Sequence, residues 1–213
     1  MKRKTVMLTT IIATLALILI GLLAWSIVGS RGEQPKYAVV SVKNDIEVRD
    51  YAPMIVAEVE ATGEREEAIT KGFSILADYI FGNNKSSSKV AMTAPVTQQE
   101  SRKLAMTAPV TQQNVDGKWQ VRFMMPSNYN LSSLPQPNNA AIQLNEVPSK
   151  RFVVIRFSGI PTESVLKKNL EKLQDHIRDE KIKTVTEPTY AFYNPPWTLP
   201  PMRRTEIMIE ISK

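Results

Sequence analysis

Two stretches of the chain decide its fold: IEVRDYAPMIVAEVEATG at residues 46–63 and IQLNEVPSKRFVVIRFSG at residues 142–159. They align at an offset of 96 residues, which places Ile46 on Ile142, and both end on glycine. Within each stretch apolar and polar residues tend to alternate, which is typical of antiparallel strands with one buried face. The chain is therefore expected to contain two copies of one strand-rich unit.

A segment with helical periodicity follows each stretch, at residues 64–81 and at residues 162–178. Four apolar residues form a stripe on each helix: Ile69, Phe73, Leu76 and Ile80 on the first, and Leu166, Leu170, Leu173 and Ile177 on the second. Thr162 is suited to cap the start of the second helix, and Gly82 to end the first. The sequence predicts an α+β fold: a pseudo-two-fold duplicated unit forming an antiparallel distorted β-barrel flanked by two α-helices.

The nonapeptide AMTAPVTQQ occurs twice without change, at residues 91–99 and 105–113. On a structural interpretation the copies are two similar strands joined by a polar turn. Each proline would then lie at an edge or bulge, because proline cannot donate a ladder hydrogen bond. On a functional interpretation Met92 and Met106 line a ligand groove. The sequence leaves both interpretations open.

An uncharged apolar run of 23 residues occupies residues 6–28. As a helix it would be about 34 Å long, enough to cross a hydrocarbon core of about 30 Å. Cations at residues 2–4 precede it, which predicts a cytoplasmic N-terminus and an exported domain, in the bacterial periplasm or at the cell exterior. The alternative is a cleaved signal peptide that releases a secreted form, although such signals have apolar cores of only about 7–15 residues. We expect an N-terminal transmembrane anchor or uncleaved signal at residues 1–29, a linker at 30–36 and one domain at 37–213.

Composition excludes several classes of function. The chain has no cysteine, so disulfides, thiolate zinc sites, iron–sulfur clusters and cysteine nucleophiles are excluded. His176 is the single histidine, and the eight glycines form no dinucleotide- or phosphate-binding motif. Half of the net charge of +6 comes from residues 2–4, which leaves too little for a nucleic-acid surface. We therefore expect a non-enzymatic protein that does not bind nucleic acid.

A proline-rich segment, NPPWTLPPMRR, lies at residues 194–204. Four prolines make such a loop stiff, so little entropy is lost when a ligand docks on it. The segment carries three apolar side chains and two guanidinium groups: Trp197, Leu199, Met202, Arg203 and Arg204. The apolar groups offer surface to a ligand, and guanidinium groups pair with carboxylates. Alternatively, the tryptophan packs into the domain and the arginines are solvated or pair with glutamates.

Several stretches carry a further resemblance: the two copies of AMTAPVTQQ, YAVVSVKNDIEVRDYAPMIVAEVE at residues 37–60, VRFMMPSNYNLSSLPQPNNAAIQLNEVP at 121–148, and FYNPPWTLPPMRRTEIMIEI at 192–211. Together they resemble the SOUL haem-binding protein family over nearly all of residues 37–213. The resemblance implies antiparallel strands in a distorted barrel flanked by two helices, and the binding of haem or another tetrapyrrole.

Haem needs an apolar surface for its ring and cations for its propionates. Arg65 and Lys71 on the first helix are further candidate partners for propionates. No motif makes His176 an iron ligand, so haem is expected to bind without a strong protein axial ligand. We expect a membrane-tethered haem- or tetrapyrrole-binding protein that acts as a carrier, buffer or sensor. The alternative is a protein-interaction or scaffold module on the same fold that does not bind haem.

Overall fold

A computed structural model describes Thr14, residues 32–85 and residues 103–212. None of the helices in this part of the chain is both long and apolar enough to span a membrane. The predicted membrane anchor lies, apart from Thr14, outside the described residues. So does the first copy of AMTAPVTQQ, including Met92.

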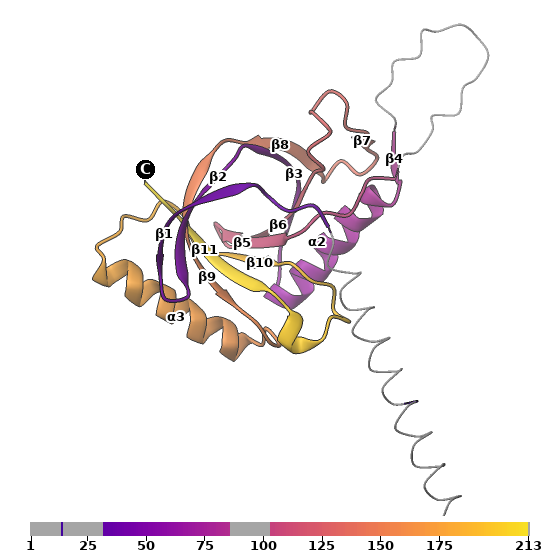
Figure 1. The fold of residues 1–213 in the computed structure, drawn as a ribbon. Coiled ribbons are helices and arrows are strands. Elements are labelled where there is room, and N and C mark those ends of the chain that lie inside the picture. The colour runs from indigo at the N-terminus through magenta and orange to yellow at the C-terminus, as the bar shows by residue number, and fades with distance from the viewer. Residues whose placement is uncertain (1–13, 15–31, 86–102, 213) are drawn as a thin grey trace, which may run out of the picture.

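Nine strands form one curled sheet in which every neighbouring pair is antiparallel. They are β1 (Tyr37–Lys43), β2 (Ile46–Tyr51), β3 (Met54–Ala61), β5 (Val110–Val115), β6 (Lys118–Met124), β8 (Gln143–Val147), β9 (Lys150–Phe157), β10 (Thr189–Phe192) and β11 (Thr205–Ile211). Their order is β1-β2-β9-β11-β10-β5-β6-β3-β8 (Figure 1). A second, small sheet pairs β4 (Asn84–Lys85) with β7 (Gln136–Pro137). The edge strands β1 and β8 do not pair with each other, so the distorted barrel that the sequence predicts is an open half-barrel.

The strand order from β2 to β8 is symmetric. Exchanging β2 with β8, β3 with β9, β5 with β10 and β6 with β11 reverses the order, so each strand has an equivalent at the same distance from the opposite end. The register follows the same symmetry. Glu47 pairs with Val154, and their counterparts in the other unit, Gln143 and Glu58, also pair with each other. This arrangement is the one that two copies of a single unit would adopt, while the duplication itself stays a prediction.

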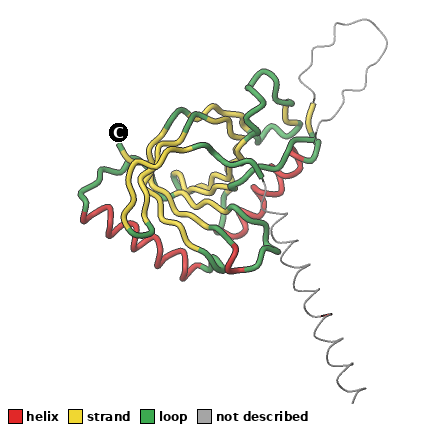
Figure 2. Tube along the Cα trace, in the orientation of Figure 1, coloured by secondary structure: helices red, strands yellow, loops and turns green. Residues whose placement is uncertain are grey.

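Two helices, α2 (Arg65–Ile80) and α3 (Glu163–Asp179), cover the convex face of the sheet (Figures 1 and 2). Helix α2 packs on β3 and β6, and α3 packs on β9 and β11. Thr162 caps α3 as predicted, because its side chain accepts a hydrogen bond from the Val165 N–H. Gly82 follows the end of α2 with a φ of +117°, a conformation that glycine adopts without strain.

The buried face of α2 differs from its predicted stripe. Leu76 and Ile80 are buried as expected, but Phe73 is 41% exposed. Gly72 faces the sheet instead, and a Cβ at this position would lie only 2.7 Å from Val121 Cγ2. The helix therefore approaches the sheet closely through its glycine, which leaves Phe73 on the flank of the helix.

Candidate functional site

The proline-rich loop joins β10 to β11 and contains one turn of 3-10 helix, Pro200–Met202. Arg203 holds the loop together from within. Its Nε donates to the Thr198 carbonyl oxygen at 2.7 Å, and its Nη2 donates to the Pro196 carbonyl oxygen. Trp197 stands on this braced backbone with 60% of its surface exposed. The alternative in which Trp197 packs into the domain is therefore wrong.

A second loop lies beside the first and extends its apolar surface. The Gly159 N–H donates to the Pro200 carbonyl oxygen at 3.0 Å, which joins the segment before α3 to the proline-rich loop. Ile160 is 57% exposed and Met202 is 39% exposed, whereas Leu199 is half-buried. Ile160, Trp197 and Met202 are thus exposed apolar side chains on two adjacent loops, and we call them the apolar loop patch.

Arg65 begins α2 and bridges to the first turn of α3. It forms an ion pair with Glu163 and donates from Nη2 to Gln112 Oε1 at 3.2 Å. Its guanidinium carbon lies 5.0 Å from the ring centroid of Tyr190 and 5.6 Å from that of Trp119. The Arg65 side chain is 22% exposed and that of Glu163 is 78% exposed. A ligand carboxylate can therefore reach Arg65 by replacing the exposed carboxylate of Glu163.

Arg65 and the apolar loop patch belong to the same region of the molecule. Glu163, the partner of Arg65, follows Ile160 by only three residues. Phe73, two turns further along α2, adds exposed apolar area about 80° around the helix axis from Arg65. The first turns of the two helices and the loop patch therefore combine a held cation with apolar surface.

Lys71 does not join this region. It follows Arg65 by six residues, which places it about 120° away around the helix axis. Lys71 lines a shallow hollow together with Glu64, Glu66 and Glu67. Three carboxylates beside the lysine oppose the approach of an anionic propionate.

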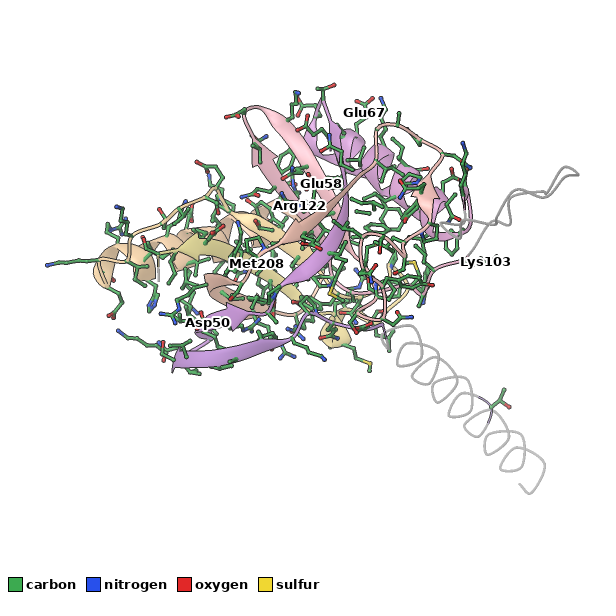
Figure 3. All side chains as sticks on the ribbon, turned by 90° about the horizontal axis from the view of Figure 1, so that it is seen from above. Asp50, Glu58, Glu67, Lys103, Arg122 and Met208 are labelled. Atoms are coloured by element: carbon green, nitrogen blue, oxygen red, sulfur yellow. The ribbon has the colours of Figure 1, made fainter. Side chains whose placement is uncertain are left out.

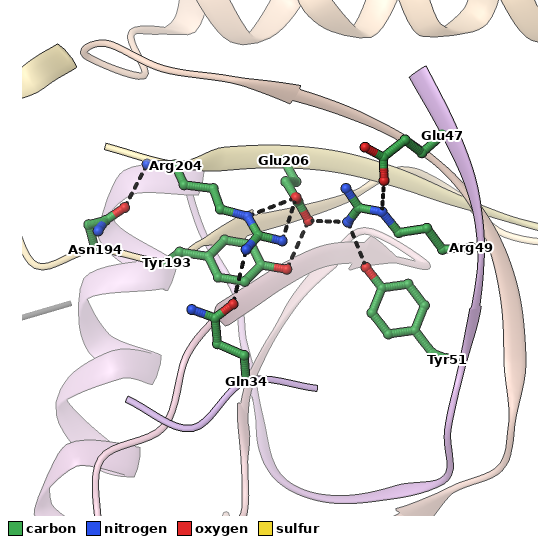
Figure 4. A network of polar contacts seen from close by, with 8 residues as sticks. All are labelled: Gln34, Glu47, Arg49, Tyr51, Tyr193, Asn194, Arg204 and Glu206. Atoms are coloured by element: carbon green, nitrogen blue, oxygen red, sulfur yellow. Dashed lines mark hydrogen bonds and ion pairs between the residues drawn. The ribbon is translucent and has the colours of Figure 1, made fainter. Parts of the chain in front are cut away.

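Arg204 is part of a buried polar network centred on Glu206 (Figure 4). Its Nε donates to Glu206 Oε1 at 2.9 Å, and its Nη1 donates to Gln34 Oε1 at 3.0 Å. Glu206 is fully buried, and its Oε2 accepts from Arg49 Nη1 at 3.0 Å and from the Tyr193 hydroxyl at 2.8 Å. Arg204 thus pairs with a glutamate, as the alternative interpretation of the sequence allowed, and its guanidinium is occupied within the domain.

Burial sets the electrostatics of this network. Burial and the nearby Glu206 carboxylate raise the pKa of Tyr51 to about 12, and the same two causes raise the pKa of Tyr193. Burial opposes the charge of Arg49, but its interactions with Glu206, Tyr51 and Glu47 together outweigh burial and raise the pKa of Arg49. The paired groups join β2, the end of β10, β11 and the linker residue Gln34. We interpret the network as a structural joint, because its charges are matched inside the domain.

The concave face of the sheet is also polar. Arg122 Nε donates to Glu58 Oε2 at 2.7 Å (Figure 3), and Lys150 Nζ donates to Glu210 Oε2 at 2.6 Å. A cavity of about 430 Å³ is lined in part by these side chains, and another of about 590 Å³ lies against the linker residues 33–36. Arg122 and Lys150 are already paired with glutamates, which makes this part of the face less suited to a ligand with carboxylates.

Met106 and His176 are the other two residues that the sequence analysis considered for the ligand. Met106 is 44% exposed and lies beside Gly32, where an added Cβ would come 3.2 Å from the Met106 carbonyl oxygen. His176 lies near the far end of α3, about 20 Å along the helix axis from Glu163, so it cannot ligate iron at the apolar loop patch. Among the residues that the structure describes, no three His, Asp or Glu side chains form a cluster able to hold a metal ion.

The fold and the candidate site define an α+β domain with a curled antiparallel sheet and an exposed, cation-flanked apolar patch. The chain belongs to the SOUL family: the sequence profile of the SOUL heme-binding protein matches residues 32–210. A comparison with curated proteins gives no match.

Among solved structures, the fold is similar to the crystal structure of the EcmrR C-terminal domain. The TM-score is 0.58 at 13% identity, covering 83% of this chain and 98% of that one. A hydrolase from Listeria innocua gives a TM-score of 0.52 at 13% identity, covering 81% of this chain and 94% of that one. EcmrR in its cryo-EM complex with DNA gives 0.54 at 13% identity, covering 100% of this chain and 71% of that one. At such identities the likeness shows the fold alone, and the expectation that this chain binds no nucleic acid stays a prediction.

Proposed function

We propose that this domain binds haem or another tetrapyrrole at the apolar loop patch and the first turns of α2 and α3. Membership of the SOUL heme-binding family supports the class of ligand. The observation that carries the location is Trp197, which is 60% exposed on a loop braced by the side chain of Arg203. The role is that of a carrier, buffer or sensor, without chemistry performed by the protein.

The residues of this surface suit the two parts of the ligand. Trp197, Met202 and Ile160 supply exposed apolar area for a flat ring, and an aromatic side chain stacks on such a ring. Arg65 supplies a guanidinium for a propionate once Glu163 is displaced. Bound haem would supply its own iron chemistry, while the protein binds and orients it without a strong axial ligand.

We further propose that residues 6–28 anchor the domain in a bacterial membrane, with the N-terminus in the cytoplasm and the domain exported. The support is the sequence: 23 uncharged residues preceded by three cations. Membranes from cells that express the full chain test this proposal. Extraction with alkaline carbonate should leave the protein in the pellet, and external protease should digest the domain in spheroplasts. Recovery of a shortened, soluble protein would support the cleaved signal peptide instead.

Haem binding is tested by titrating the detergent-solubilised full chain with hemin and following the Soret band. Trp197→Ala should weaken binding by about tenfold, because the stacked ring and its apolar area are lost. The matched control is Phe81→Ala, which removes an aromatic ring that is 61% exposed at the end of α2. The control should bind hemin like the unmodified chain.

Two results would contradict the proposal. Absence of a saturable Soret change in the unmodified chain would show that the chain does not bind haem. Equal affinities of the two variants would show that Trp197 does not contribute to binding. A protein partner recovered from membranes equally well with and without hemin, and lost with Trp197→Ala, would favour the interaction-module alternative.

A further inference from the structure

Exposed apolar side chains surround the point at which the described domain begins. Gly32 lies against the backbone of residues 106–108, and the Ala108 N–H donates to the Glu33 carbonyl oxygen at 2.8 Å. At the next linker residue, Gln34 accepts from Arg204, two residues after Met202. Met106 and Met202, exposed by 44% and 39%, therefore both belong to segments that contact the linker. Ile160 and Trp197 continue the apolar surface on the two adjacent loops.

The length of the chain before Gly32 places this surface close to the end of the apolar run. Four residue steps separate Val28 from Gly32, and an extended chain covers at most about 14 Å over that span. The interfacial layer outside the hydrocarbon core is itself about 5–8 Å thick on each side. With Val28 at the edge of the hydrocarbon core, Gly32 can lie beyond the outer edge of the headgroup layer by only about one residue's diameter.

We infer that Met106, Ile160, Trp197 and Met202 dock the domain on the interfacial layer of the lipid bilayer. The inference rests on the proposed function, because it takes residues 6–28 as the membrane anchor. Tryptophan prefers this layer, since its ring is apolar and its N–H needs a polar partner. Because Arg203 already holds the backbone of the loop, little conformational entropy is lost when Trp197 contacts the lipid. The proposed tetrapyrrole site then opens toward lipid, and an apolar ligand can exchange between membrane and protein without crossing water.

The test uses tryptophan fluorescence of the full chain in phosphatidylcholine vesicles. The chain has three tryptophans, so Trp25→Phe with Trp119→Phe leaves Trp197 as the single fluorophore. Bromine on the acyl chains quenches tryptophan on contact, and lipid brominated near the headgroup end of the chain probes the interfacial layer. We expect the Trp197 emission to fall about twofold relative to ordinary vesicles, and less with lipid brominated near the chain end. The matched control keeps Trp119, which is half-buried beside Arg65, and its emission should be unchanged.

Each outcome decides the inference. Unchanged Trp197 emission in chain that resists alkaline carbonate overturns it, and so does a chain that carbonate releases, because the tether is then missing. A hemin titration of the same vesicles separates this inference from the proposed function. Hemin binding without quenching by bromine would contradict the membrane docking alone. Quenching without hemin binding would contradict the proposed ligand and support the membrane docking.

Discussion

Glu163→Gln should tighten hemin binding, because Glu163 occupies the guanidinium that a propionate needs. The ion pair joins a largely buried Arg65 to a Glu163 side chain that is 78% exposed. A pair with so exposed a partner contributes about 0.2–1 kcal/mol. In the Glu163→Gln variant the ligand no longer has to break this ion pair, so the affinity should rise by about 1.4- to 5-fold.

The assay is an equilibrium hemin titration of the full chain in detergent, followed at the Soret band. Glu171→Gln is the matched control, because Glu171 is an exposed acid on the same helix and its loss changes the net charge equally. The control should bind like the unmodified chain. Arg65→Gln should weaken binding by about tenfold, since a charge-assisted hydrogen bond to the propionate is lost. Added salt should shrink the gain from Glu163→Gln, because it already screens the exposed ion pair.

Equal gains from Glu163→Gln and Glu171→Gln would refute the reasoning, because the effect would then be general electrostatic attraction. Unchanged affinity of Arg65→Gln would do the same, since Arg65 would have no part in binding. Thermal unfolding of each variant guards against a trivial explanation. Loss of Glu163 should lower the stability by about 1 kcal/mol or less, which leaves the fold intact.

Three further predictions concern the fold. Gly72→Ala should destabilise the domain by about 1–3 kcal/mol in urea unfolding, because the new Cβ would meet the Val121 side chain; wild-type stability would mean that α2 lies further from the sheet. Glu206→Gln should cost about 3–5 kcal/mol by the same measurement, since it removes the carboxylate of Arg204 and leaves the buried Arg49 with Glu47 alone, and a loss below 1 kcal/mol would contradict this role. Burial raises the pKa of Tyr79 to about 12, so the native state keeps a proton that the unfolded state releases near its ordinary pKa of about 10, and stability should fall as pH rises from 10 to 12. Tyr51 and Tyr193 contribute to the same fall, so Tyr79→Phe should reduce it in part, and an unchanged pH profile would show that Tyr79 does not contribute.

The fold was largely predictable because its signals are local. Alternation of apolar and polar residues marks β3, β6 and β11, and Thr162 and Gly82 mark helix ends. How far the barrel closes was not predictable. Whether β1 and β8 meet depends on the curvature of the whole sheet, which no single segment encodes.

The candidate site was predictable only in part, because side-chain partners come from distant segments. The sequence drew attention to the loop with Trp197, and exposure there agrees with a ligand role. The sequence did not distinguish the two arginines of that loop, although Arg203 braces the loop backbone and Arg204 pairs with Glu206. Glu206 precedes the buried isoleucines of β11 in an alternating pattern, yet it is fully buried, and its partner Arg49 lies 157 residues away in the sequence.

Contacts between loops were also hidden from the sequence. Ile160 stands before the N-cap of α3 as an isolated apolar residue, and only the contact of its loop with the proline-rich loop makes it part of a larger apolar surface. Phe73 fits a core stripe by spacing, yet Gly72 takes the place nearest the sheet. A glycine within an apolar helix face was the available signal, since it permits close packing of the helix on the sheet, while the Phe73 ring packs at the edge of this contact on Phe123.

The central claim is the location of the tetrapyrrole, and nuclear magnetic resonance of the full chain in nanodiscs tests it most directly. The paramagnetic iron of bound hemin broadens the amide signals of nearby residues. We predict that broadening begins at Arg65, Ile160 and Trp197 and spares Arg122 and Lys150 on the concave face. Broadening centred on Arg122 and Lys150, with the loop signals left sharp, would contradict the proposed location.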